Sequence, residues 1–458
     1  MRSLSALLWT ATAATVGLEA AEPPNAKALL GGATTIFTET GSAFSQSAAN
    51  LPLEKLVDFA AGNRVFNTSW TIAGGSVELF DGVGPLFNRA SCSGCHVHDG
   101  RGQPPERADR PMLSMLLRIS VPGVDERGGP KPHPIYGGQL QDRANLGFKP
   151  EAQVQLSWEE RPGTFPDGER YSLRRPRWRL ENWSDGEPGA ELLVSARTAP
   201  AVFGLGLLEA ARDETILVRV DADDKDGDGI SGRANQVWDA TRRSTALGRF
   251  GWKAGQPTLR QQTAAAFRED MGLTTKLFAE DGRTAVQREA HSALEGGSPE
   301  VEERLMDRLE FYLRTLAVPA RRRLDDPKVQ AGEALFEQLG CTKCHVPQTV
   351  TGDAPVPQLS RQTIYPYSDL LLHDMGDALA DGRPEFGASG REWRTAPLWG
   401  IGLQPIVSKH HFLLHDGRAR GLLEAILWHG GEAEASRKGF EAIPLAEREA
   451  VVEFLKSL

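Results

Sequence analysis

The chain has 458 residues, of which 40% are hydrophobic and 25% are charged, and its formal net charge is −9. This composition is typical of a globular protein with room for two domains, and it excludes a chain that is disordered throughout. The sequence has no block of Lys and Arg interleaved with aromatic residues, so no nucleic-acid partner is expected. Small molecules or a redox protein fit this charge balance better.

The N-terminal segment predicts export. One basic residue is followed by an apolar run from Leu4 to Leu18, and small residues then lead into Ala-Glu-Pro-Pro. This pattern is typical of a secretory signal peptide, here at residues 1–21, and it predicts a periplasmic protein. The apolar run is short for a membrane span, so no integral span is expected after cleavage. An uncleaved N-terminal anchor is the alternative.

All four cysteines fall in two motifs of the same form, CSGCH and CTKCH. The six residues of the two motifs are Cys92, Cys95, His96, Cys341, Cys344 and His345. Two thiols at this spacing can add to the two vinyl groups of a haem, and the His that follows can bind the iron. A disulfide closing a two-residue loop would stabilise little, and a zinc ribbon does not require His after each pair. The motifs therefore predict two covalently bound c-type haems.

Sequence elements around the two motifs are repeated. Leu-Phe precedes the first cysteine in both GPLFNRASCSGCH and GEALFEQLGCTKCH, which predicts a helix entering each motif. Helices with an aromatic residue on the apolar face are predicted at 308–316 and 450–458, and they would close each unit. The tripeptide Arg-Thr-Ala, followed by Pro, occurs at 197–200 and at 394–397. The chain thus reads as one duplicated module.

We therefore expect a mainly α-helical fold with two tandem cytochrome c-like domains. The N-terminal domain would span residues 31–318 and the C-terminal domain residues 328–458, with a Pro- and charge-rich linker at 319–327. The first domain would be enlarged by loop-rich insertions, among them the Pro-, Arg- and Trp-rich segment 161–183, to which no role is assigned.

An acidic segment, DADDKDGDGISG, lies at residues 221–232. The spacing of Asp224, Asp226 and Asp228 followed by Gly229 matches the start of a calcium-binding loop, but the twelfth position is Asn235 instead of Glu. It is therefore not an EF-hand. The segment is either a calcium site of another kind or a solvated acidic turn.

The C-terminal segment FLLHDGRARGLLEAILWHGGEA contains His415 and His429. Apolar residues from Leu422 onward predict a helix that ends at Gly430, with His429 on the buried side. An inward His is a hydrogen-bonded core residue, a cation at the C-terminus of a helix, or a metal ligand. The helical pattern alone does not choose among the three.

The two CxxCH motifs occur together with DGVGPLFN, GRFGWKA, LLLHDMG and the C-terminal HDGRA segment. In this combination the chain resembles the di-haem oxidoreductase branch of the bacterial di-haem cytochrome c peroxidase superfamily, from about residue 31 to the end. The resemblance implies a C-terminal haem that receives electrons from a small redox protein or quinol-linked donor. It also implies an N-terminal haem that reacts with hydrogen peroxide. A non-enzymatic electron carrier and a related di-haem oxidase or oxygenase are the alternatives.

The resemblance also assigns residues. His429 lies at the family's spacing from His415 and would be the second axial ligand of the C-terminal haem, where the peroxidases usually have Met. Two imidazoles would lower the potential of that haem relative to His/Met ligation. Met375, in LLLHDMG, is a rival ligand. The sixth ligand of the N-terminal haem stays open.

In the first unit, WKAGQPTLRQQTAAAFREDMG matches the family's segment on the distal side of the reactive haem. By this resemblance Trp252 lies between the haems, Gln262 is a hydrogen-bond donor, and Asp270 is the acid/base group in place of the family's Glu. The segment is shorter than in the peroxidases, so Glu269 is the alternative acid. Members of the family also hold a calcium ion between their domains.

Overall fold

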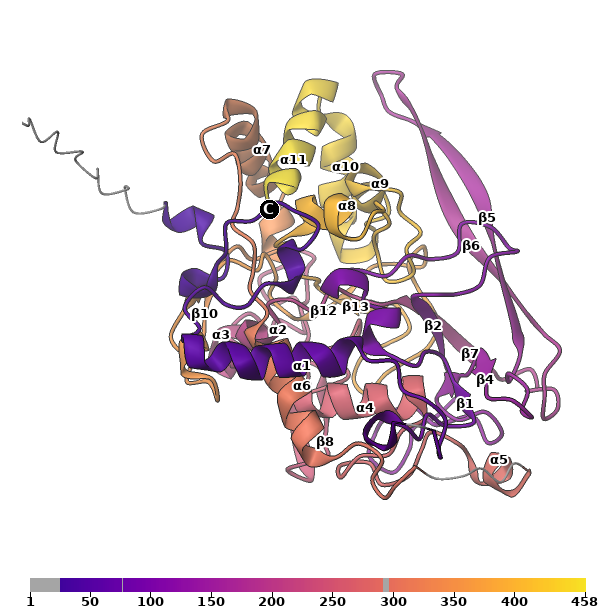
Figure 1. Cartoon of the computed structure of the whole chain (residues 1–458). Helices are drawn as coiled ribbons and strands as arrows, with labels where there is room; N and C mark the ends of the chain where they lie inside the picture. Colours follow the sequence, from indigo (N-terminus) through magenta and orange to yellow (C-terminus); the bar gives the residue numbers. More distant parts are fainter. Residues whose placement is uncertain (1–24, 76, 291–295) are drawn as a thin grey trace, which may run out of the picture.

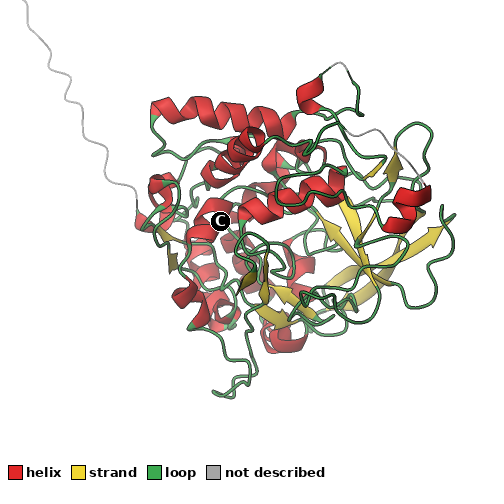
Figure 2. Ribbon diagram, turned by 90° about the horizontal axis from the view of Figure 1, so that it is seen from below, coloured by secondary structure: helices red, strands yellow, loops and turns green. Residues whose placement is uncertain are grey.

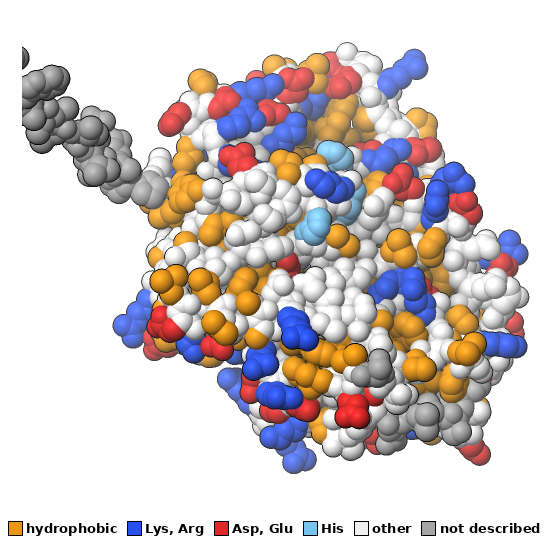
Figure 3. Space-filling model, viewed as in Figure 1, with side chains coloured by type: hydrophobic (Ala, Val, Ile, Leu, Met, Phe, Trp, Pro, Cys, Tyr) orange, Lys and Arg blue, Asp and Glu red, His pale blue; other side chains and the backbone are white. Residues whose placement is uncertain are grey.

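A computed structural model describes residues 25–75, 77–290 and 296–458 (Figure 1). The predicted signal peptide lies outside these residues. Within the described part of the chain, no helix has the length and apolar character that crossing a membrane requires. Side chains of both charges are interspersed over the face in Figure 3, in keeping with the small net charge.

The helices of the described chain are mostly short. Their bounds are α1 Leu56–Asn67, α2 Leu205–Ala210, α3 Asp213–Leu217, α4 Leu259–Met271, α5 Ala285–Ala290, α6 Glu303–Thr315, α7 Pro327–Gln338, α8 Gln404–Val407, α9 Leu422–Leu427, α10 Glu434–Ala442 and α11 Leu445–Ser457. The predicted closing helices are present as α6 and α11, and the predicted helix before the second motif is α7. Before the first motif the expected helix is absent, because Leu86–Phe87 forms a short strand paired with residues 143–144.

Two helix pairs pack in the same way, α1 on α6 and α7 on α11 (Figure 1). In each pair the helices cross at a glycine. A Cβ atom on Gly62 would lie 2.1 Å from the carbonyl oxygen of Arg308, and one on Gly332 would lie 1.9 Å from that of Ala450. Only glycine allows backbones to approach so closely. This shared contact supports the duplication that the sequence indicates.

The prediction of a mainly α-helical protein is wrong. The chain is 31% helix and 18% strand, with the strands in several small sheets. The strands are β1 Leu86–Phe87, β2 Met115–Ser120, β3 Gln139–Leu140, β4 Arg143–Ala144, β5 Gln153–Thr164, β6 Arg170–Glu181, β7 Leu193–Thr198, β8 Gln236–Asp239, β9 Ser244–Leu247, β10 Thr349–Val350, β11 Thr363–Ile364, β12 Leu372–Asp374 and β13 Glu392–Arg394. All the pairings are antiparallel, and the largest sheet has the order β3-β2-β7. Most strands lie on one side of the molecule and most helices on the other (Figure 2).

The insertion expected to be rich in loops is instead a long hairpin of β5 and β6, in register from Gln153↔Glu181 to Thr164↔Arg170. Pro166-Asp167-Gly168 forms its turn, a sequence with strong turn preference. Both edges of a two-stranded ribbon are unpaired, so prolines are tolerated within it. The tip is attached to α11, because Arg448 donates to Asp167 at 2.6 Å and to Glu169 at 2.8 Å.

The structure does not show two separate cytochrome c-like domains. One hydrophobic core cluster includes Tyr312 of α6 and Phe454 of α11, so the cores of the two repeats are continuous. The segment expected to be a linker is also attached to the rest of the structure, because Ala320 and Arg321 are buried and Pro319 pairs with Ile36. The boundary at residues 319–327 stays a prediction.

Candidate functional site

One cavity of about 870 Å³ lies at the centre of the described structure and reaches both CxxCH motifs. It brings together residues from segments far apart in the sequence. The predicted site residues that line it are Cys92, Cys95, His96, Trp252, Gln262, Glu269, Asp270, Cys341, Cys344, His345 and His429. None of the four cysteines is in a disulfide bond.

His96 is prepared to bind a metal through its Nε2 atom. Its Nδ1 atom lies 2.7 Å from the carbonyl oxygen of Pro200, which can only accept, so Nδ1 carries the proton and Nε2 keeps its lone pair. Burial lowers the pKa of His96 to about 4, so the ring is neutral at ordinary pH. Pro200 belongs to the first Arg-Thr-Ala-Pro repeat. This repeat therefore orients the His96 ring, a role that could not be predicted from the sequence.

The second motif has the same arrangement. The Nδ1 atom of His345 lies 2.9 Å from the carbonyl oxygen of Tyr367, and burial lowers the pKa of His345 to about 4. His429 follows the end of α9, and its Nδ1 lies 2.7 Å from the carbonyl oxygen of Ala425. Burial lowers the pKa of His429 as well. Both rings are therefore neutral, with Nε2 available.

The rings of His345 and His429 face each other across the cavity, with their centres 6.4 Å apart. Two imidazoles that bind one metal ion from opposite sides, each nitrogen about 2 Å from the metal, have ring centres about 6 Å apart. The spacing therefore fits a single ion held between the two rings. Met375, the rival ligand, also lines the cavity.

Buried polar atoms without a hydrogen-bond partner indicate what kind of bound molecule this cavity could hold. Among the described residues, Arg89 Nη2 and Arg101 Nε are buried without a hydrogen-bond partner, and both side chains line the cavity. A buried guanidinium donor without an acceptor costs free energy, and a carboxylate of a bound group would supply that acceptor. A haem carries two propionate carboxylates. Paired thiols and neutral imidazoles fit a haem at each motif, and the free guanidinium donors beside the first motif fit propionates there.

Asp270 is the acid group that faces the first motif. Burial raises the pKa of both Cys92 and Cys95 to about 12, and the nearby charge of Asp270 adds to the increase. Burial also raises the pKa of Asp270 itself, although Arg118 and a hydrogen bond from Gln139 oppose this. That hydrogen bond runs from Gln139 Nε2 to Asp270 Oδ1 at 2.8 Å.

Glu269, the alternative acid, lines another part of the cavity. Its carboxylate lies 3.3 Å from Arg268, and its carbonyl oxygen accepts from the amides of Gln139 and Gln141. The structure therefore places Asp270, and not Glu269, beside the haem motif. Sequence reasoning missed Gln139, which lies on β3 in an insertion.

The neighbouring glutamines of α4 differ in their contacts. The Gln261 amide is buried and donates to Trp238 and Gln256, so it is structural. The side chain of Gln262 lines the cavity, and within the described chain it has no hydrogen-bond partner. Gln262 and Asp270 are about 12 Å apart along the helix axis at 1.5 Å per residue. They reach different parts of the cavity.

Trp252 lies where the two repeats meet. Its Nε1 donates to the carbonyl oxygen of Thr198 at 2.8 Å, and its own carbonyl oxygen accepts from Arg394 N at 2.9 Å. Thr198 and Arg394 belong to the first and second Arg-Thr-Ala-Pro repeats. The guanidinium of Arg101 lies 4.9 Å from the centre of the indole. Trp252 therefore contacts elements next to both haem motifs.

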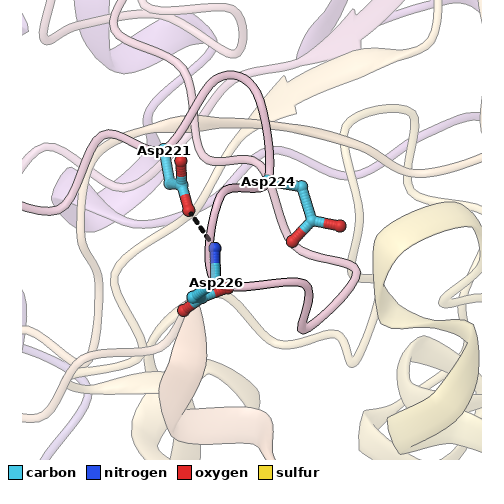
Figure 4. A group of neighbouring side chains, drawn as sticks. All are labelled: Asp221, Asp224 and Asp226. Atoms are coloured by element: carbon cyan, nitrogen blue, oxygen red, sulfur yellow. Dashed lines mark hydrogen bonds between the residues drawn. The ribbon is translucent and has the colours of Figure 1, made fainter.

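The acidic loop, residues 221–228, does not line this cavity. Figure 4 shows three of its side chains, Asp221, Asp224 and Asp226. Carboxylate oxygens of Asp221, Asp224 and Asp226 lie within 4.8 Å of one another. The sequence analysis missed Asp221, and it included Asp228, whose carboxylate instead pairs with Lys343 at 3.0 Å. Calcium binding at this loop stays a prediction.

Comparison with known proteins identifies the family of the chain. A family model described as "Di-haem oxidoreductase, putative peroxidase" matches residues 25–458. The chain belongs to this family. Its members are di-haem oxidoreductases, so the family implies two haems per chain. A solved structure of hydrazine synthase from Kuenenia stuttgartiensis matches over 98% of this chain and 100% of its own, with 15% identity and a TM-score of 0.36. No curated protein matches the chain.

Proposed function

We propose that this di-haem oxidoreductase reduces hydrogen peroxide at the haem next to His96, with electrons that arrive through the haem between His345 and His429. The difference between the two ends of the cavity carries the proposal. His345 faces a second imidazole, whereas in the described chain no imidazole ring is paired with His96. The N-terminal end offers the carboxyl group of Asp270 instead.

The residues at the N-terminal end match what peroxide reduction requires. Hydrogen peroxide takes up two electrons and two protons and leaves as two molecules of water. A haem held there by Cys92, Cys95 and His96 would supply the electrons. The carboxylate of Asp270 can accept a proton from one peroxide oxygen and return it to the departing oxygen. The free amide of Gln262 can donate a hydrogen bond in another part of the same cavity, about 12 Å from Asp270 along α4.

Trp252 is the residue we assign to the passage of electrons between the two ends. It is buried, it lines the shared cavity, and it bonds to both repeats. Trp252→Phe keeps most of the packing area, so both haem spectra should change little while reduction of the N-terminal haem slows. A stopped-flow reduction at the unaltered rate would remove Trp252 from the route.

The proposed cellular location rests on the N-terminal sequence. A signal peptide at residues 1–21 would export the chain to the periplasm, where the thiols of the two motifs would bind their haems covalently. Denatured protein should then keep the mass of two haems per chain. The electron donor would be a small redox protein or a quinol-linked protein.

The deciding experiment is peroxide consumption by purified holoprotein with a reduced donor. Asp270→Asn should slow the reaction by about 100- to 10,000-fold, the usual contribution of a positioned acid/base group. Glu269→Gln is the matched control and should keep most of the activity. A wild-type protein that transfers electrons but leaves peroxide intact would be an electron carrier. Turnover only with an organic substrate and oxygen would indicate an oxidase or oxygenase.

A further inference from the structure

A buried histidine that the proposed reaction does not use lies beside the second haem motif. The Nε2 atom of His373 lies 2.8 Å from Asp369 Oδ2, and its Nδ1 atom lies 2.7 Å from Glu432 Oε2. The same Nδ1 lies 3.5 Å from the sulfur of Cys344. His373 is only 3% exposed. Its position on β12 is fixed by pairing with Trp393 of β13.

The contacts define the charge of this ring. A neutral imidazole has one N–H, so it cannot donate to two carboxylates at once, whereas an imidazolium can. Burial works against a charged ring, but the hydrogen bonds to Asp369, Cys344 and Glu432 outweigh it and raise the pKa of His373 well above its usual value. Burial also works against an ionised Glu432, yet its hydrogen bonds, the one from His373 first, lower the pKa of Glu432 to about 2.

Both carboxylates are held by further donors. Asp369 Oδ1 accepts from Leu371 N at 2.9 Å. Glu432 accepts from the hydroxyl of Ser231 at 2.6 Å and from Asp374 N at 3.1 Å. Two carboxylates and one imidazolium leave a net charge of −1 in a place shielded from water. Because screening is weak in the interior, this charge acts on its surroundings far more strongly than a surface charge would.

We propose that Asp369, His373 and Glu432 form a charged triad that lowers the midpoint potential of the C-terminal haem. The triad touches the sulfur that would attach this haem, and Glu432 lies three residues after the proposed ligand His429. Negative charge beside a haem stabilises the ferric over the ferrous iron, since the ferric state carries one more positive charge. The triad thus adds to the low potential that two imidazole ligands favour.

The consequence concerns the direction of electron flow. A low potential at the C-terminal haem makes it the better electron donor, so electrons pass to the N-terminal haem and do not remain where they enter. The inference rests on the proposed haem at Cys341 and Cys344, but it does not depend on peroxide as the substrate. Its test therefore measures potentials and not turnover.

Two variants of the holoprotein should shift the midpoint potential in opposite directions. The double variant Asp369→Asn/Glu432→Gln removes two negative charges, so the potential of the low-spin haem should rise even if His373 then loses its proton. His373→Gln removes the positive charge between the two carboxylates, so the potential should fall. Asp377→Asn is the control: this carboxylate is 89% exposed in its side chain, and its removal should leave the potential unchanged.

Spectroelectrochemical titration with parallel electron-paramagnetic spectra checks this. Opposite shifts with a low-spin haem retained would support the triad. Shifts in the same direction, or no shift in the double variant while the haem stays low-spin, would overturn it. Loss of His429 ligation through a structural defect would appear as a high-spin signal and a rise in both variants, which also counts against the inference. Absence of haem in the wild-type protein would instead refute the proposed function.

Discussion

The hydrogen bond from Gln139 to Asp270 should set the pH at which peroxide reduction fails. This bond donates to the ionised carboxylate, so it holds the pKa of Asp270 below the value that burial alone would give. Replacing Gln139 with Leu removes the donor and keeps a side chain of similar length. The pKa of Asp270 should therefore rise.

The size of the shift follows from the strength of the bond. A hydrogen bond to a charged group contributes about 1.5–3 kcal/mol. One pKa unit corresponds to about 1.4 kcal/mol, so the pKa of Asp270 should rise by about one to two units. Asp270 must be ionised to accept the first proton from peroxide. The rate is therefore full above this pKa and is lost as the pH falls through it, so the acid limb of the pH–rate profile should move to higher pH.

Single-turnover reaction with peroxide, followed by stopped-flow absorbance over a range of pH, measures this limb directly. Gln141→Leu is the matched control, because the Gln141 amide donates at 2.7 Å to the carbonyl oxygen of Glu269 and not to the acid. It should leave the limb in place. An unmoved limb in Gln139→Leu, or an equal movement in Gln141→Leu, would refute the assignment of Asp270 as the titrating group.

Three further outcomes are expected. His429→Ala should convert the low-spin C-terminal haem to high spin, and an unchanged electron-paramagnetic spectrum would direct attention to Met375 as the ligand. Lys253→Met should lower the free energy of unfolding by about 3–5 kcal/mol in a denaturant titration, because it leaves the buried carboxylate of Asp381, now 3.0 Å from the ammonium, without its cation. Calcium should bind the acidic loop, so a chelator should lower the melting temperature and calorimetry should register binding; no heat and no change in melting would identify a solvated turn.

The candidate haem-binding residues could be named from the sequence because the CxxCH motifs are local. Two thiols and a histidine within five residues have few other purposes, and the family resemblance gave His429 its place opposite His345. The same local patterns located α6, α7 and α11 correctly.

The acid group and the strands could not be predicted fully, because they depend on contacts between residues far apart in the sequence. The choice between Asp270 and Glu269 depends on the direction in which a helix end faces, and the hydrogen bond that selects Asp270 comes from Gln139 on a distant strand. The extent of the strands was missed, because the sequence pattern of the 161–183 insertion indicated turns with at most short strands. The Pro-Asp-Gly turn at residues 166–168 was a signal that could have revealed the longest hairpin.

The repeats also show why one continuous core replaces two independent domains. The peptide N–H of Thr198, in the first repeat, donates at 2.7 Å to the carbonyl oxygen of His415 in the second unit. The peptide N–H of Arg394, in the second repeat, donates at 2.9 Å to the carbonyl oxygen of Trp252 in the first. Each Arg-Thr-Ala-Pro segment thus donates a backbone hydrogen bond to the opposite unit of the chain. Since a buried N–H without an acceptor is costly, a separated half would lose contacts at the very point where the proposed electron route crosses between the haems.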